Sequence, residues 1–357
     1  MSLELEEKAV IKYLSKLFHP PISVSTFKKL GVGVLGVAYL IEFESSGEKK
    51  RLVLKTLSSK GFGQDFPADR ANTLIYAHSV YNKLSNHVRS YDTGAILHDG
   101  SLISVGNAEE FFILMDFVSG EEYAKDLDRI RGISTLRALD IERAKILAEY
   151  EAKIHSTKKE DPTLYVRRIR DLVGRGDCIT GIIDTYPKDE RTYSFTSDEE
   201  FKAIEKKSIE WRWKIKDKTH RLCQVHGDIH PFNILWQSDH AFILLDRSRG
   251  EWGEAADDVS CLSINYLFWS LMAYGRLTGP FEKLFDIFIR RYMDLTKDEE
   301  MLEVIQPFYA FRSLVIAHPI FYPKVSVENR RRIFNFMNSI LETEKFDYRE
   351  VNSYIKG

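Results

Sequence analysis

Residues 225–246 form a short strand-like segment within a part of the chain whose other periodic segments have helical spacing. They read VHGDIHPFNILWQSDHAFILLD, so apolar runs stand on both sides of polar side chains. Short runs rich in β-branched and aromatic residues are typical of strands. Asp228 and Asn233 are five residues apart, and Asp246 ends the second apolar run thirteen residues after Asn233. This spacing predicts polar side chains held rigidly by two short strands.

These polar residues have the chemistry that phosphoryl transfer needs. The reaction uses a carboxylate that orients and deprotonates the attacking hydroxyl, and oxygen ligands for Mg²⁺, which is a hard cation. A D-x-x-x-x-N loop followed by an aspartate at the end of an apolar strand supplies both. A zinc site made of His226, Asp228 and His230 is disfavoured because the sequence has no separate fourth ligand cluster. A β-hairpin with coincidental polar residues explains the combined pattern less well.

The two parts of the chain differ in their periodicity. Apolar residues in 5–18 and 69–84 have helical spacing, whereas the other segments up to residue 118 contain strand-like runs. After the break at Ser119-Gly120, helical patterns dominate; they cover residues 136–154, 201–216, 259–274, 281–296 and the C-terminal region. We therefore predict an α+β fold with a small β-rich lobe over residues 1–119 and a larger, mainly helical lobe over residues 120–357.

A glycine-rich motif, Gly31, Gly33 and Gly36, lies between two predicted strands of the first lobe. Glycine allows backbone N–H groups to approach an anion closely. A dinucleotide-binding fold would need a helix directly after the last glycine, but residues 37–43 have a strand pattern. The sequence also lacks the GxxxxGK[ST] motif of a P-loop. A glycine loop between two strands is the arrangement that covers ATP phosphates in kinases.

Lys55 follows this motif by about 20 residues, on the strand expected after the hairpin. Alone, it would be interpreted as a surface lysine on a half-buried strand. After a glycine loop, it matches the kinase lysine that holds the α- and β-phosphates of ATP.

The motif HGDIHPFNILW followed by LLD resembles the aminoglycoside phosphotransferase and choline kinase-like family, a branch of the protein-kinase-like fold that phosphorylates small molecules. The likeness spans most of the chain. It includes the glycine loop, Lys55, a hinge-like MDFVSG at 115–120, a helix ending in KIH at 153–155 and the acidic ADDVS at 256–260. The resemblance implies a protein-kinase-like two-lobed fold. It also implies transfer of the γ-phosphoryl group of ATP, or of GTP, to a hydroxyl of a small molecule with Mg²⁺ as cofactor.

The same resemblance implies roles around the HGD loop. Asp228 would be the catalytic base or would orient the hydroxyl, and orientation matters more than basicity when the transition state is loose. Asn233 and Asp246 would bind Mg²⁺. His226 would brace the loop within the catalytic set, and Asp258 would anchor it.

For the nucleotide, the resemblance implies contacts from the glycine loop, the lysine strand and the hinge. Kinases pair the lysine with an acidic residue on the next helix, and Asp69 is the best candidate, with a helix N-cap role as the alternative. The hinge would meet the adenine through its backbone. The full expected set comprises Gly31, Gly33, Gly36, Lys55, Asp69, Asp116, Phe117 and Val118.

The acceptor is expected in the helical lobe, facing Asp228. Its candidate contacts are Arg249, Glu251, Trp252 and Arg312. Polycationic aminoglycosides would require a dominant carboxylate cluster, and choline would favour an aromatic cage. Here both signs of charge are mixed, and the arginines can equally clamp a carboxylate or a phosphate. This mixed pattern of charges favours an ordinary metabolite with a hydroxyl group as the acceptor.

Two alternative functions remain open. A protein kinase is disfavoured because the loop reads HGD instead of HRD, and no APE motif is present. A nucleotide-binding regulatory protein without turnover is disfavoured because Lys55, Asp228, Asn233 and Asp246 are all in place.

The composition of the chain limits which binding partners and which cellular location can be expected. Lys+Arg number 51 and Asp+Glu number 53, so the net charge of −2 gives no overall signal for nucleic acid or anionic lipid. The three cysteines, Cys178, Cys223 and Cys261, lie far apart and are typical of free thiols. The acidic start MSLELEE lacks signal-peptide features, and polar residues interrupt the longest apolar stretch, 259–274. We therefore expect a cytoplasmic protein without membrane or nucleic-acid partners.

Overall fold

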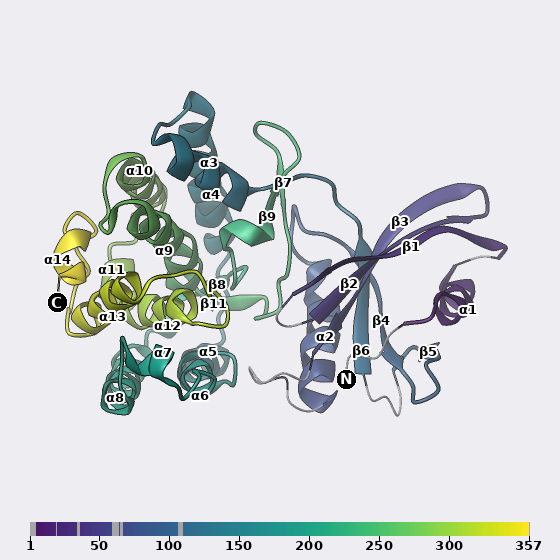
Figure 1. The fold of residues 1–357 in the computed structure, drawn as a ribbon, viewed down its shortest axis with the longest axis horizontal. Helices are drawn as coiled ribbons and strands as arrows, with labels where there is room; N and C mark the ends of the chain where they lie inside the picture. The colour runs from purple at the N-terminus through teal and green to yellow at the C-terminus, as the bar shows by residue number, and fades with distance from the viewer. Residues whose placement is uncertain are drawn as a thin grey trace. The chain divides into compact units, whose positions relative to one another are not determined.

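The structure is a computed structural model that describes residues 5–18, 20–33, 36–58, 64, 67–105 and 110–356. The chain forms two compact units (Figure 1). The first unit comprises Met1–Ser119 together with the later segment Ile243–Ser248. The second unit comprises Gly120–Phe242 and Arg249–Gly357.

The first unit is built on a six-stranded antiparallel sheet with the strand order β1-β2-β3-β6-β4-β5. The strands are β1 (Ile22–Val32), β2 (Gly36–Ser45), β3 (Glu48–Leu57), β4 (Ser90–Ile96), β5 (Leu102–Ile103) and β6 (Glu110–Asp116). The turn between β2 and β3 contains Ser46 and Gly47, both with positive φ. This turn matches the hairpin that separates the glycine motif from the lysine strand.

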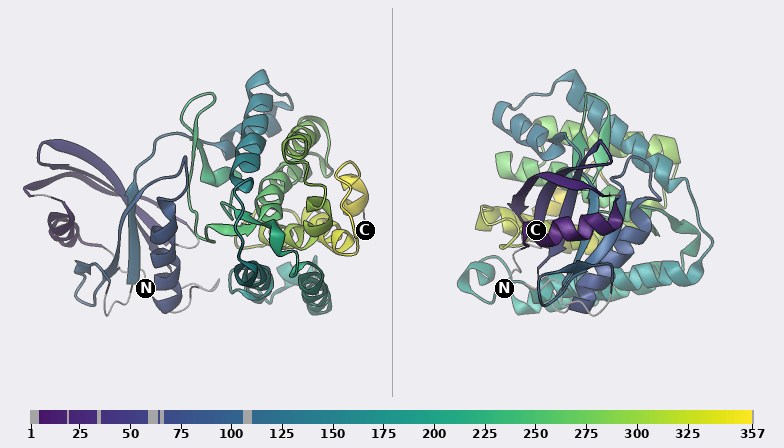
Figure 2. Two further views of the ribbon diagram at one scale, coloured as in Figure 1. Left: turned by 180° about the vertical axis from the view of Figure 1, so that it is seen from behind. Right: turned by 90° about the vertical axis from the view of Figure 1, so that its right-hand side faces the viewer.

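The sheet carries a helix on each face (Figure 2). Alternate side chains of a strand point to opposite faces. Leu52 and Leu54 of β3 therefore belong to the core that holds α1 (Glu7–Leu17). Ile113 of β6 belongs to the core that holds α2 (Pro67–Tyr81). Two apolar layers thus fix the central strands from both sides.

A short stretch late in the sequence completes the first unit. It begins within β10 (Phe242–Leu244), and the N–H of Leu244 donates to the carbonyl of Asn86 at 3.0 Å. Ile243 and Leu245 pack against the core beside α2. This packing brings the following residue, Asp246, into the same unit as the lysine strand.

The second unit is mainly helical. Its helices are α3 (Tyr123–Ile133), α4 (Ala138–His155), α5 (Pro162–Gly174), α6 (Ile179–Asp184), α7 (Glu190–Tyr193), α8 (Asp198–Ile215), α9 (Ala255–Tyr274), α10 (Gly279–Thr296), α11 (Met301–Val304), α12 (Gln306–Ala317), α13 (Val327–Leu341) and α14 (Val351–Ile355). Two small sheets interrupt them, one of three strands and one of two. In the first, β7 (Glu121–Glu122) pairs with β9 (Ile234–Trp236), and in the second β8 (Leu222–Gln224) pairs with β11 (Trp252–Glu254).

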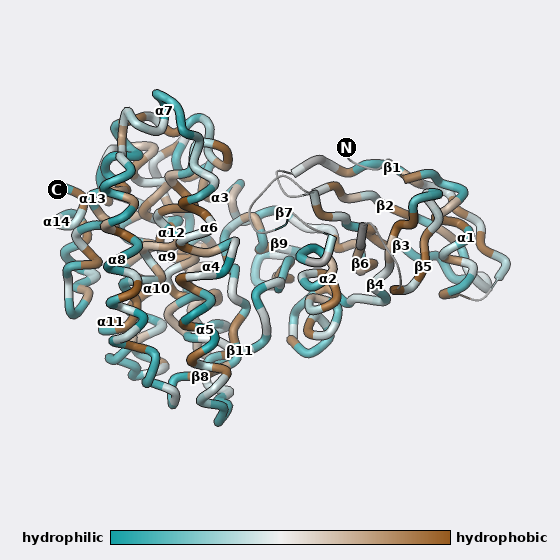
Figure 3. The backbone as a smooth tube through the Cα atoms, turned by 90° about the horizontal axis from the view of Figure 1, so that it is seen from below, coloured by the Kyte–Doolittle hydropathy of each residue, from teal (hydrophilic) through white to brown (hydrophobic). Residues whose placement is uncertain are grey.

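Helix α9 lies among the other helices of this unit (Figure 3), and most of its side chains are buried. Its polar side chains find partners nearby, because Ser263 donates to the carbonyl of Val259 and Asn265 to that of Cys261. Buried polar groups need such partners to avoid a desolvation cost. The helix expected from the pattern at 259–274 is therefore present, and it is buried. No helix in the described part of the chain is long and apolar enough to cross a membrane.

Glu151 is an exception within this core. The side chain lies on α4, is fully buried, and neither carboxyl oxygen has a hydrogen-bond partner among the described residues. Burial, and then the charge of Asp258, raise the pKa of Glu151 well above its ordinary value. Burial therefore favours the protonated form of this carboxyl group in the folded protein.

We predict that Glu151→Gln changes how stability depends on pH. Above the ordinary pKa of 4.5, the unfolded chain releases a proton that the folded chain keeps. This one group lowers the free energy of unfolding by up to about 1.4 kcal/mol for each pH unit until the folded-state pKa is reached. Urea unfolding from pH 4.5 to 8 should show the variant gaining stability relative to the wild type as pH rises. A difference that stays constant with pH would contradict the assignment.

Candidate active site

The HGD loop connects β8 to β9 in the second unit. Gly227 has a φ of +85°, a conformation that L side chains rarely adopt, and an added Cβ would lie 2.9 Å from the Cβ of Arg249. A short 3₁₀ turn, Pro231–Asn233, then leads into β9. The glycine between the histidine and the aspartate is therefore required by backbone conformation as well as by space.

Asp258 anchors this loop from the first turn of α9. Its carboxylate accepts the backbone N–H groups of His226 at 2.7 Å and of Gly227 at 2.6 Å. The ring of His155, at the end of α4, contacts the same carboxylate with Nε2 at 3.2 Å from Oδ2. Burial would raise the pKa of Asp258, but the hydrogen bond and charge of His155 and the nearby His226 hold it below its ordinary value. The anchoring role implied by the resemblance is confirmed.

His226 and Asn233 brace the loop from within. The buried His226 ring accepts the backbone N–H of Asp228 on Nδ1 at 3.2 Å. The Asn233 amide donates from Nδ2 to the carbonyl of Asp228 at 3.0 Å. Among the residues that the structure describes, none donates to Oδ1 of Asn233, which leaves this oxygen available as a ligand.

The Asp228 side chain is about 20% exposed and is surrounded by positive charge. Arg312 Nη1 lies 2.5 Å from its Oδ1, and Arg249 Nε lies 3.9 Å from the same oxygen. His230 Nε2 lies 3.7 Å from Oδ2. Burial would raise the pKa of Asp228, but the charges of His230, Arg312 and Arg249 outweigh it and hold the pKa well below its usual range. Asp228 is therefore an oriented, ionised carboxylate.

Arg312 connects two acidic residues of this site. From α12, its Nη2 donates to Asp257 at 2.5 Å and to the carbonyl of Gly227 at 2.8 Å. The sequence suggests Arg312 as an acceptor contact and does not reveal Asp257 as its partner. Because these residues come from α12 and α9, 55 positions apart, no local pattern could reveal the bridge.

In the first unit, Lys55 and Asp246 form an ion pair although 191 positions separate them in the sequence. Lys55 lies on β3 between Ala38 of β2 and Ile113 of β6, and its Nζ is 3.1 Å from Oδ2 of Asp246. Asp246 has a φ of +58°. This left-handed conformation costs about 1–2 kcal/mol for a residue other than glycine, so the surrounding structure must hold it in place.

The glycines of the motif lie at the end of β1 and the start of β2. Gly33 donates its N–H to the carbonyl of Gly36 at 2.9 Å, whereas Val34 and Leu35 lie outside the described residues. Only Gly36 is required by close packing, since an added Cβ would lie 1.9 Å from the carbonyl oxygen of Thr56. Gly31 and Gly33 have room for a side chain, so packing within the described residues does not explain them.

The hinge residues follow β6. The N–H groups of Asp116 and Phe117 donate to the carbonyls of Arg89 and Arg51, at 3.0 and 3.1 Å. The N–H of Val118 has no recorded partner within the described residues and remains available to a ligand. Two of the three hinge N–H groups thus donate to backbone carbonyl groups of the first unit.

Asp69 lies in the first turn of α2, where its carbonyl accepts from the hydroxyl of Thr73 at 3.0 Å. A carboxylate in the first turn interacts favourably with the helix dipole. Lys55 forms an ion pair with Asp246, whereas the pairing of Lys55 with Asp69 stays a prediction.

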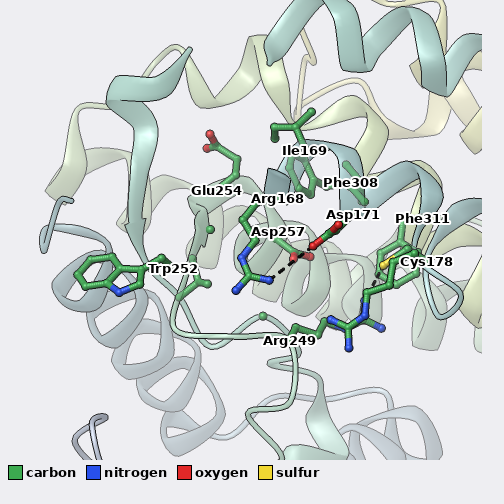
Figure 4. A pocket seen from close by; sticks show the side chains of 15 residues that line it. Arg168, Ile169, Asp171, Cys178, Arg249, Trp252, Glu254, Asp257, Phe308 and Phe311 are labelled. Atoms are coloured by element: carbon green, nitrogen blue, oxygen red, sulfur yellow. Dashed lines mark hydrogen bonds and ion pairs between the residues drawn. The ribbon is translucent and has the colours of Figure 1, made fainter. Parts of the chain in front are cut away.

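A pocket opens beside the HGD loop within the second unit (Figure 4). It is lined by Arg168, Ile169, Asp171, Leu172, Arg175, Cys178, Val225, Gly227, Arg249, Trp252, Gly253, Glu254, Asp257, Phe308 and Phe311. Of the expected acceptor contacts, Arg249 and Trp252 line it. Arg312 and Glu251 are not part of the lining; Arg312 donates to Asp257, and the backbone carbonyl of Glu251 accepts from the N–H of Val225 at 3.0 Å. Arg168 is not among the acceptor contacts expected from the sequence.

Two side chains, one in each unit, offer oxygen atoms of the kind that Mg²⁺ binds. Asn233 offers an amide oxygen and Asp246 a carboxylate, and Mg²⁺ binds few protein oxygens because it keeps several waters. The described residues contain no group of three or more His, Cys, Asp or Glu side chains that could enclose a metal ion. The side chains present are therefore suited to an ion that also binds phosphate oxygens.

No family model matches the chain, and no curated protein is similar to it in sequence. Solved structures are similar in fold. An ethanolamine kinase from Plasmodium vivax has a TM-score of 0.52 at 13% identity, covering 97% of this chain and 85% of its own. A proposed aminoglycoside phosphotransferase from Ralstonia eutropha has a TM-score of 0.53 at 13% identity, covering 99% of both chains.

A thermostable mutant of an aminoglycoside phosphotransferase, in ternary complex with AMP-PNP and hygromycin B, has a TM-score of 0.52 at 17% identity, covering 94% of this chain and 97% of its own. At these identities the likeness establishes the fold and not the activity. The chain therefore has the protein-kinase-like fold of small-molecule kinases and phosphotransferases, and the predicted α+β fold class is confirmed.

We predict that Asp258→Asn destabilises the second unit. The amide nitrogen of asparagine would face one of the two backbone N–H donors, leaving a buried donor without an acceptor and removing a charge-assisted bond. The free energy of unfolding in urea should fall by about 3 kcal/mol. Asp294→Asn, at an exposed position of α10, is the control and should change stability by less than about 0.5 kcal/mol. Equal effects of the two variants would argue against the anchor.

Proposed function

We propose that this protein is a small-molecule kinase related to the aminoglycoside phosphotransferase and choline kinase-like family, and that it transfers the γ-phosphoryl group of ATP to a hydroxyl group. The observation that supports this most is the environment of Asp228. An ionised carboxylate, held at the edge of a pocket by a loop with three separate braces, is suited to orienting a hydroxyl.

The ion pair between Lys55 and Asp246 supports the nucleotide half of the proposal. Kinases hold the α- and β-phosphates with a lysine on the third strand and Mg²⁺ with an aspartate after a later strand. Both residue types occur here, and they meet across 191 positions of sequence. In the similar aminoglycoside phosphotransferase, the bound nucleotide is AMP-PNP.

The proposed reaction is an in-line displacement. The acceptor hydroxyl donates a hydrogen bond to Asp228 while its oxygen attacks the γ-phosphorus, and the bond from that phosphorus to the β,γ-bridging oxygen breaks to release ADP. The hydroxyl proton passes through Asp228 to solvent. Because its pKa is held low, Asp228 acts mainly by orienting the hydroxyl.

Mg²⁺, held by Asn233 and Asp246, would neutralise charge on the phosphates. Lys55 would bind the α- and β-phosphates, and the free N–H of Val118 would donate to the adenine. The acidic partner of Lys55 in the family, for which Asp69 is the candidate, would keep the lysine extended.

We predict that Asp228→Asn abolishes phosphoryl transfer but keeps nucleotide binding. Asparagine preserves shape and accepts a hydrogen bond only weakly, so ADP formation with an acceptor should fall at least about 100-fold. The Kd for Mg·ATP, from calorimetry, should change less than about threefold because Asp228 faces the acceptor.

The acceptor panel for this assay holds aminoglycosides, choline, ethanolamine, homoserine, sugars, nucleosides and a protein extract. Acceptor-dependent ADP release that is lost in Asp228→Asn establishes the kinase. Labelling of proteins alone would favour the protein kinase instead. Tight ATP binding with no turnover of any acceptor would favour the regulatory alternative.

We predict that Asp246→Ala weakens nucleotide binding in a Mg²⁺-dependent manner. Loss of this carboxylate removes a metal ligand and the partner of Lys55. The Kd for ATP with Mg²⁺ should rise at least about tenfold, whereas the Kd in EDTA should change much less. Asp294→Ala is the matched surface control. Equal weakening with and without Mg²⁺ would remove Asp246 from the metal site.

A further inference from the structure

The pocket beside Asp228 has its acidic side chains already paired with the protein's own arginines. Glu254 Oε1 lies 2.7 Å from Arg221 Nη2, and Asp257 Oδ1 lies 2.5 Å from Arg312 Nη2. Asp171 lies 3.6 Å from Arg167 and 3.9 Å from Arg168. These are the three carboxylates of the lining. A cationic acceptor would have to displace an arginine from one of them, which costs more than binding to a free carboxylate.

Two of the three aromatic side chains of the lining, Trp252 and Phe311, are also engaged by the protein's own cations, and the third, Phe308, is buried. The guanidinium groups of Arg249 and Arg312 each lie 4.7 Å from the ring centroid of Phe311. Lys159 Nζ lies 5.4 Å from the ring of Trp252. A cage for a quaternary ammonium needs open aromatic faces around the ligand. The pocket therefore lacks both features that recognise a cationic acceptor.

Arg249, in contrast, is only 17% exposed, yet its contacts with the protein are long or are made to poor acceptors. Its Nη1 donates to the sulfur of Cys178 at 3.1 Å, and its Nη2 donates to the carbonyl of Asp177 at 3.4 Å. The carboxylates of Asp177 and Asp228 lie 3.7 and 3.9 Å away. Charge-assisted N–H···O bonds are shorter, about 2.7–2.9 Å.

The comparison with Arg312 makes the difference clear. Arg312 makes three bonds of 2.5–2.8 Å and is 5% exposed, so it is committed to the protein. The thiol that contacts Arg249 is a poor acceptor, and burial raises the pKa of Cys178 to about 12, which keeps it neutral. Arg249 therefore has donor capacity that an anionic ligand can satisfy.

We propose that the acceptor is a short hydroxylated acid whose carboxylate or phosphate group binds Arg249, with Arg168 on the facing helix α5, and presents its hydroxyl to Asp228. This inference rests on the proposed kinase activity. Arg249 Nε is 3.9 Å from the Asp228 carboxylate, so an anion on Arg249 and a hydroxyl on Asp228 belong to one small molecule. Phe311 stacks on the guanidinium and fixes its plane for bidentate binding.

The test uses matched acceptors that differ in one group. They are 4-hydroxybutyrate, 1,4-butanediol and 4-amino-1-butanol, with glycerate, glycerol and serinol as a second set. ADP release with Mg·ATP measures kcat/KM for each. The acid of a set should exceed its diol by roughly 10- to 100-fold, as expected for hydrogen bonds to a charged group, and the amine should be the poorest.

Arg249→Met should raise KM for the acid by roughly 10- to 100-fold and should lower kcat/KM for the acid much more than for the diol. Arg249→Lys should restore part of the preference, since it keeps the charge but loses the bidentate geometry. A purely structural role would lower activity on acid and diol alike. Arg290→Met, at an exposed position of α10, is the control.

Binding is measured separately from turnover. Glycerate, 4-hydroxybutyrate and inorganic phosphate should raise the Tm of the wild type in a concentration-dependent manner, and the rise should be lost in Arg249→Met. No such rise, or turnover of amines in preference to their matched acids, would overturn the anionic acceptor while leaving the kinase intact. Anion binding without phosphoryl transfer to any acceptor would instead overturn the proposed kinase.

Discussion

The buried carboxylate of Asp258 is the contact on which the proposed active site depends. Two consecutive backbone N–H groups of the HGD loop end on its two oxygens, and His155 approaches it from another helix. The core helix α9 thereby fixes the backbone from which Asp228 projects. With His226 and Asn233 bonded to the backbone of Asp228 on either side, the loop has little freedom to move the carboxylate. Rigidity of this kind is what a reaction limited by orientation needs.

Arginines form ion pairs with the acidic side chains around that loop. Arg312 joins Asp228 to Asp257, and Arg221 holds Glu254 at the entrance to α9. These ion pairs offset part of the cost of burying the acidic groups, because an unpaired buried charge would be costly. Arg249 stands apart, because its neighbours are a neutral thiol, a carbonyl and distant carboxylates. The difference between these arginines separates the groups that maintain the site from the one suited to a ligand.

Much of the architecture could be predicted from local patterns. The periods of 2 and 3.6 located the hairpin, the flanking helices and the buried helix α9, and the spacing of Asp228, Asn233 and Asp246 identified the loop. Contacts between distant segments were predicted only where a family resemblance supplied them, as for Asp258. The bridge from Arg312 to Asp257 escaped prediction, because helix periodicity says which face is buried and not which residue of another helix lies against it. The assignments of metal, nucleotide and acceptor residues stay predictions.

The chain passes between the two units three times, because Ile243–Ser248 belongs to the first unit while its flanks belong to the second. A fragment that stops at Ser119 would therefore lack Asp246 and would leave the apolar surface for Ile243 and Leu245 uncovered. A fragment that starts at Gly120 would expose those two side chains. No single cut of the gene yields both units whole, so a dissected protein would need the six-residue segment supplied by redesign, for example by circular permutation.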